Sequence, residues 1–215
     1  MTYGLEEYLG DLVGQGVDPN DQIYNYLSST DTVRLKHWVS RLEKIRNIKV
    51  KGKKKTGQKS RLVGYVFEKV VRVLLDGCRA ISHDGNVRST ISEIDFRILI
   101  EPVGATIPML RAAGTHAIGE AKCVAKGLKI EWFTELSGIL STHSANLAIM
   151  FTASPPKKLR SDQRHALSLI KASNDQTIVP FGLHHIDRVA NGENFLKILS
   201  HQCVACETHS SDLRI

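Results

Sequence analysis

The feature that most constrains the fold is a change in apolar spacing beyond residue 61, where helix-like and strand-like segments begin to alternate. Apolar side chains at 63–74 recur at helical spacing, and Gly77 follows as a residue that often ends helices. Further segments alternate along the chain: strand-like at 92–100 and 116–124, helix-like at 132–143, strand-like at 147–152, helix-like at 158–172, strand-like at 177–183, and helix-like at 193–201.

This alternation predicts an α/β sandwich with a central mixed β-sheet flanked by helices. The run 147–152 is apolar up to its final threonine, which is typical of a strand buried on both faces. The two strand-like runs before it should be neighbours, and a further strand near 80–83 should adjoin them. A length of 215 residues, with 42% hydrophobic and 24% charged residues, suits one globular core with a small accessory segment.

We divide the chain into four parts. Residues 1–48 show helical spacing and predict a helical N-terminal accessory unit, while 62–201 form the core and 202–215 a C-terminal tail. Between them, 49–61 contain seven basic residues and no acidic one, which favours a mobile basic linker. Such a linker is either simply solvated or able to neutralise nucleic-acid phosphates. The candidate phosphate-binding residues are Lys51, Lys53, Lys54, Lys55, Lys59 and Arg61.

The residues with the clearest chemical meaning lie in the two strand-like runs. Glu120 and Lys122 are two apart in Gly-Glu-Ala-Lys, so on a strand they point to the same face. Asp95 interrupts the apolar neighbours Ile94 and Phe96, and paired strands would bring it to Glu120. Two carboxylates on rigid strands suit Mg²⁺ or Mn²⁺, which prefer oxygen ligands. Lys122 would then hold or deprotonate the attacking water and offset negative charge on the phosphate.

Glu68 interrupts the apolar stripe of the segment 63–74, and we expect it to be a third acidic ligand or a group just behind the ligands. The alternative for Glu68 is a surface carboxylate paired with Arg72 one turn later. For Glu120 and Lys122 the alternative is a solvated ion pair at a sheet edge.

Together these residues resemble the PD-(D/E)XK nuclease superfamily, with Asp95 as its acidic residue, Glu120-Ala121-Lys122 as its E-x-K and Glu68 as the upstream helical acid. The segment 136–154 also resembles the Mrr-like restriction endonuclease branch. The resemblance covers residues 62–183 and implies a restriction-endonuclease-like fold, DNA hydrolysis with Mg²⁺ or Mn²⁺, and frequently a homodimer. The expected function is that of a DNA endonuclease in a restriction, repair or phage-defence setting. Ile94 stands where proline is common in the superfamily.

Two other functions are compatible with the same residues. The enzyme could resolve branched DNA junctions, or the chain could be a non-catalytic DNA-binding module on a nuclease-like fold. The net charge of +7 suits DNA, and equally an acidic protein or membrane surface.

No apolar run reaches bilayer length and no signal-peptide pattern is present, so we expect a cytoplasmic protein. A structural zinc site is a weaker alternative for the tail, with four candidate ligands: His201, Cys203, Cys206 and His209.

Overall fold

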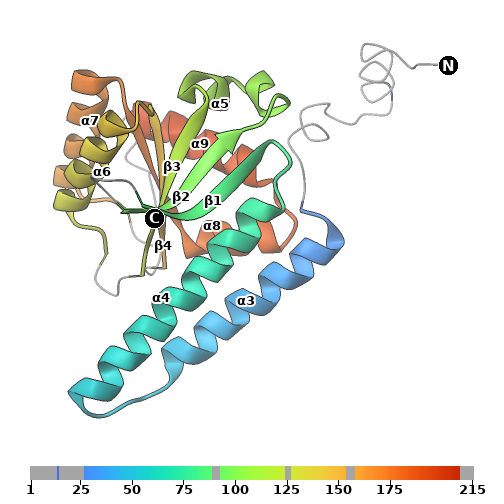
Figure 1. The fold of residues 1–215 in the computed structure, drawn as a ribbon, viewed down its shortest axis with the longest axis vertical. Helices are drawn as coiled ribbons and strands as arrows, with labels where there is room; N and C mark the ends of the chain where they lie inside the picture. The colour runs from blue at the N-terminus through green and yellow to red at the C-terminus, as the bar shows by residue number, and fades with distance from the viewer. Residues whose placement is uncertain (1–13, 15–26, 89–92, 124–126, 154–157, 209–215) are drawn as a thin grey trace.

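The computed structural model describes residues 14, 27–88, 93–123, 127–153 and 158–208 (Figure 1). Its centre is a mixed sheet of five strands in the order β1-β2-β3-β4-β5. The strands are β1 (Ile81–Arg88), β2 (Glu93–Ile100), β3 (His116–Lys122), β4 (Leu147–Thr152) and β5 (Thr177–Gly182). The first three strands pair antiparallel and the last three parallel. The predicted α/β sandwich with a central mixed sheet is therefore confirmed.

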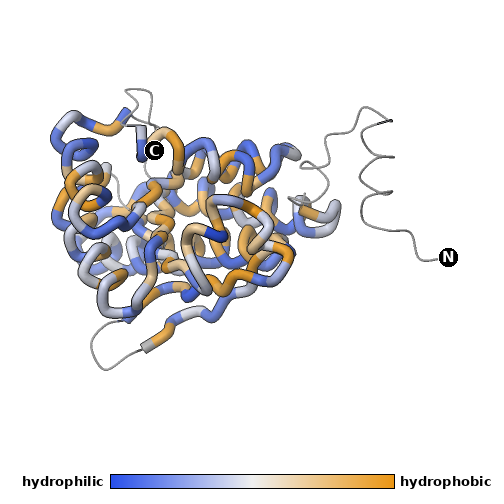
Figure 2. Tube along the Cα trace, turned by 90° about the horizontal axis from the view of Figure 1, so that it is seen from above, coloured by the Kyte–Doolittle hydropathy of each residue, from blue (hydrophilic) through white to orange (hydrophobic). Residues whose placement is uncertain are grey.

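Helices cover both faces of this sheet (Figure 1). The helical segments are α3 (Ser29–Asn47), α4 (Lys53–Asp76), η1 (Gly104–Thr106), α5 (Pro108–Ala113), α6 (Ile130–Thr142), α7 (Ser161–Asn174), α8 (Leu183–Ala190) and α9 (Phe195–Glu207). Both η1 and α5 occupy the long connection between β2 and β3. Among the helices that surround the sheet, apolar and polar stretches alternate along the chain, as expected of elements with one buried face (Figure 2).

The central strand β4 shows how the two layers are built. Ile149 and Phe151 belong to an apolar cluster with the inner sides of α3, α4, α8 and α9. Ala148 and Met150 belong to a second cluster with α6 and α7. Because side chains alternate across a strand, a strand covered on both sides is apolar along most of its length, and in β4 the one polar residue is Thr152 at its end. All six residues of β4 are buried, as its sequence predicted.

The expected mobile linker at 49–61 is wrong from Lys53 onward, because α4 begins there and runs unbroken to Asp76. Lysine and glutamine are good helix formers, and a glycine such as Gly57 is tolerated inside a long helix. The Lys59 ammonium also donates hydrogen bonds to the carbonyl oxygens of Arg46 and Ile48, each at 2.6 Å. These bonds tie α4 to the end of α3, and the two helices form one antiparallel hairpin (Figure 1).

The two chain ends differ from the predicted boundaries as well. The last helix continues past residue 201, so that residues 202–207 belong to α9 rather than to a separate tail. Of the predicted N-terminal helical unit, α3 is described, while residues 1–13 and 15–26 lie outside the described residues. Within the described ranges no helix is long and apolar enough to cross a membrane.

His185 is a buried imidazole that the fold holds in its neutral form. Its side chain is 1% exposed, and its Nδ1 accepts the backbone N–H of Gly182 at 3.1 Å. An accepting Nδ1 carries no proton, so protonation there would break this bond. Burial, with the neighbouring His184 and Arg188, lowers the pKa of His185 from 6.5 to about 3.

This lowered pKa predicts a loss of stability in acid. Below pH 6.5 the unfolded chain protonates His185 while the folded chain does not, so the free energy of unfolding should fall as pH drops toward 3. At about pH 4.5 the loss of unfolding free energy that His185 causes is roughly 3 kcal/mol. In His185→Asn the amide oxygen can accept the Gly182 bond and does not titrate. Urea unfolding across this range should show a shallower pH dependence for the variant; equal slopes would contradict the assignment.

Candidate active site

The strands β2 and β3 separate at the position where the candidate carboxylates lie. Their last backbone pair in this direction is Phe96 with Gly119. Beyond this pair the side chain of Asp95 takes the place of a backbone partner, since its Oδ2 accepts the N–H of Ala121 at 2.8 Å. The bond fixes the Asp95 carboxylate between two diverging strands, one residue from Glu120.

Glu120 and Lys122 form a close ion pair at the end of β3. The Lys122 Nζ donates to the Glu120 Oε1 at 2.6 Å, and the two side chains are 28% and 14% exposed. On its other side the backbone of β3 pairs with β4, where Glu120 is opposite Met150 and Lys122 opposite Thr152. A strand held from both sides positions these two groups more rigidly than a loop could.

Glu68 approaches the same edge from α4. It is half-buried, and its charge and that of Asp95 repel each other closely enough to affect the Glu68 pKa. The cations Arg72 and Lys69 on the same helix partly offset this repulsion. The structure therefore brings the predicted helical acid close enough to Asp95 for the Asp95 charge to raise its pKa.

Burial and mutual repulsion dominate the electrostatics of these acids. Burial is the largest cause that raises the pKa of Glu68, of Asp95 and of Glu120 above their ordinary values. The Asp95 charge raises the pKa of Glu120 further, while the bond to Lys122 opposes that rise. Perturbed carboxylates gathered in one place are characteristic of functional sites.

The pKa of Lys122 is raised, whereas burial lowers the pKa of many buried lysines. Burial by itself would lower its pKa, but the hydrogen bond to Glu120 and the charges of Glu120, Glu135 and Asp95 raise it above the ordinary value. The ammonium therefore stays protonated at neutral pH, and it carries its charge into a group of carboxylates.

Two members of this neighbourhood were not identified from the sequence, and both lie on α6. The Trp132 ring is 5.9 Å from the Lys122 Nζ and 5.6 Å from the Lys129 Nζ, within the range of cation–π attraction. The exposed Glu135 raises the pKa of both Glu120 and Lys122 by its charge. Their spacing of three residues, which places them on one helical face, was the available signal.

The donor set at this edge fits a hard divalent cation. Asp95 and Glu120 offer carboxylate oxygens on rigid strands, and their like charges disfavour each other unless a cation lies between them. Among the described residues no group of three or more His, Cys, Asp or Glu side chains is close enough to hold a metal ion. Asp95 and Glu120 are thus the primary candidates, and Glu68 would have to move closer to join them.

The other predicted nucleic-acid-binding residues lie on the α3–α4 hairpin. Lys51 lies in the α3–α4 turn, and the exposed residues Lys53, Lys54, Lys55 and Arg61 are on the first turns of α4. Lys59 is already bonded to the end of α3, as described above.

In the last helix, His201 is exposed, whereas Cys203 and Cys206 are buried. Burial raises the pKa of both thiols, that of Cys206 to about 12. This disfavours the thiolate form that binds zinc. The fourth candidate ligand, His209, lies outside the described residues.

The repulsion within the cluster predicts that Asp95→Asn stabilises the metal-free protein. The amide oxygen can still accept the Ala121 N–H, while the buried negative charge is removed. We expect a higher melting temperature than wild type at neutral pH in chelator. Adding Mn²⁺ should then stabilise wild type more than the variant, because the variant lacks one anionic ligand. A variant that melts lower in chelator, or gains as much from Mn²⁺, would contradict the arrangement.

Comparison of the chain with known protein families, with curated proteins and with solved structures found no match. The candidate site consists of an acid fixed between two diverging strands, a Glu–Lys pair on the next strand, and a third acid on the helix beside them.

Proposed function

We propose that the chain is a metal-dependent endonuclease that hydrolyses DNA phosphodiester bonds. The observation that carries the proposal is the placement of the Asp95 carboxylate, held by the Ala121 N–H next to the Glu120–Lys122 pair. The resemblance of these residues to the PD-(D/E)XK superfamily supports the same reaction.

Phosphodiester hydrolysis needs an activated water and stabilisation of negative charge on the phosphate. A bound Mg²⁺ or Mn²⁺ would polarise a phosphoryl oxygen and lower the pKa of a bound water. Asp95 and Glu120 are the residues that would hold this ion, with Glu68 as a further carboxylate. Since one Glu120 oxygen accepts from Lys122, the other remains for a second partner.

Lys122 supplies positive charge at the place where the phosphate would bind. Its raised pKa means that it acts as a cation and hydrogen-bond donor at neutral pH, rather than as a free-amine base. Glu120 orients the ammonium through the 2.6 Å bond, and the Trp132 ring faces it at 5.9 Å. A donor fixed before the reaction stabilises developing charge without having to reorganise.

The net charge of +7 supports a polyanionic substrate such as DNA. A restriction, repair or phage-defence role belongs to the same proposal. Cutting both strands of a duplex at one place would call for two copies of this site related by a two-fold axis. A homodimer is therefore part of the proposal, and sedimentation of the chain with and without duplex DNA would test it.

Lys122→Ala should lower the cleavage rate by at least about 100-fold, because it removes the cation that stabilises charge on the phosphate. Its matched control is Lys171→Ala, since Lys171 is a half-exposed lysine paired with Asp175 at 2.7 Å. That variant should cleave like wild type. The rates would be measured on linear duplex, single-stranded, methylated and four-way-junction DNA in Mg²⁺ and Mn²⁺.

The outcomes separate the competing functions. Undiminished cleavage by Lys122→Ala would show that Lys122 is not part of the active site. Binding of DNA with no cleavage of any form, in either metal, would favour a non-catalytic DNA-binding module. Preferential cutting of the four-way junction would identify a junction-resolving enzyme built on the same site.

A further inference from the structure

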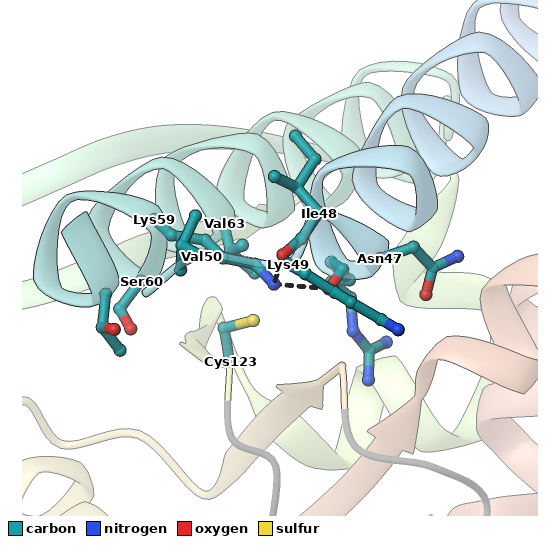
Figure 3. A pocket seen from close by; sticks show the side chains of 10 residues that line it. Asn47, Ile48, Lys49, Val50, Lys59, Ser60, Val63 and Cys123 are labelled. Carbon is teal, nitrogen blue, oxygen red and sulfur yellow. Dashed lines mark hydrogen bonds between the residues drawn. The ribbon is translucent and has the colours of Figure 1, made fainter. Parts of the chain in front are cut away.

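A cavity of about 730 Å³ lies between the α3–α4 hairpin and the end of β3. Its hairpin side includes Arg46, Lys49 and Lys59, and its other side is marked by Cys123. Figure 3 shows the labelled hairpin side chains and Cys123 on opposite sides of this open space. The cavity thus separates the turn end of the α3–α4 hairpin from β3, the strand that bears Glu120 and Lys122.

The lining is positively charged. Arg46, Lys49 and Lys59 are cationic, and the lining residues that the structure describes include no acidic side chain. Asn47, Thr56 and Ser60 add polar groups to the same wall. The Lys59 ammonium is held in place by the carbonyl oxygens of Arg46 and Ile48, so its charge forms a fixed part of the wall. Cationic and polar side chains around an open groove are the chemistry that binds a phosphate backbone.

The cavity is also next to the candidate active site. Cys123 directly follows Lys122 in the sequence. On α4, Val63 lines the cavity and Glu68 is five residues further along, which is a rise of about 7.5 Å along the helix axis. Cys123 packs against the apolar cluster on the hairpin side of the sheet, whereas Lys122 faces Trp132 of α6 on the other side. A DNA strand that occupies the cavity would therefore pass around the end of β3 to reach the carboxylate cluster.

We propose that this cavity binds the sugar–phosphate backbone of a single DNA strand next to the bond that is cut. The inference rests on the proposed nuclease function and narrows its substrate class. The cavity has the volume of a small-molecule site, which is the scale of about one or two nucleotides and not of a turn of duplex. The preferred substrate is then DNA with a single-stranded end or branch beside the cleavage position.

The test measures binding separately from cleavage, with the full chain in chelator. The probes are a fluorescent blunt duplex and the same duplex with a single-stranded tail. Arg46→Ala/Lys49→Ala removes two charges from the cavity. The control Lys36→Ala/Lys44→Ala removes two charges from exposed positions on α3 that do not line it. Thermal melting of both double variants verifies that the hairpin still folds.

Wild type should bind the tailed duplex more tightly than the blunt one, and Arg46→Ala/Lys49→Ala should lose most of that preference. Its plot of log affinity against log salt should become shallower by about 0.7 for each lost single-strand phosphate contact. The control pair should keep both the preference and the slope. Equal effects of the two double variants, or equal wild-type binding to tailed and blunt duplex, would overturn the proposal.

These results are independent of catalysis. A loss of tail preference confined to the cavity variant would support the strand site even if no DNA were cleaved, and the absence of cleavage would then count against the nuclease function alone. Metal-dependent cleavage with no tail preference would retain the nuclease and reject the strand site.

Discussion

The hydrogen bond from the Ala121 N–H to the Asp95 carboxylate is the interaction on which the candidate site depends. Two antiparallel strands that stop pairing leave backbone groups without partners, and a buried N–H without an acceptor is costly. Asp95 satisfies one such group with a charged side chain instead of a carbonyl. The place where β2 and β3 part is thereby fixed, and so is a carboxylate next to Glu120.

The same arrangement places repelling charges together. Glu68, Asp95 and Glu120 each have a raised pKa, chiefly because of burial, and a single lysine is bonded to one of them. Arg72 and Lys69 offset part of the Glu68 charge, and Lys122 offsets part of the Glu120 charge. A cation bound between Asp95 and Glu120 would relieve the repulsion that remains between these two carboxylates. The helix that brings Glu68 to the cluster also forms one wall of the cationic cavity, so α4 links the site to its surroundings.

Much of the fold and the main site residues could be predicted because they depend on local patterns. The almost wholly apolar β4 and the Glu-x-Lys spacing of β3 have direct geometric consequences. The prediction of a mobile linker was wrong because the structure of this segment depends on tertiary contacts. The lysine-rich segment from Lys53 is helical because it packs as a hairpin against α3, where Lys59 binds backbone carbonyls. The contribution of Glu135 could not be read from the chain either, since it arises only when α6 lies beside the end of β3.

If these carboxylates hold a metal that makes the chain a nuclease, DNA cleavage should depend on both the metal and the carboxylates. The most direct measurement is the nicking or linearisation of supercoiled plasmid by wild type and Glu120→Gln, in Mg²⁺, in Mn²⁺ and in chelator. We predict cleavage by wild type in at least one metal, its loss in chelator, and little or no cleavage by the variant. Cleavage that persists in chelator, equal cleavage by Glu120→Gln, or intact plasmid with wild type in both metals would contradict the account.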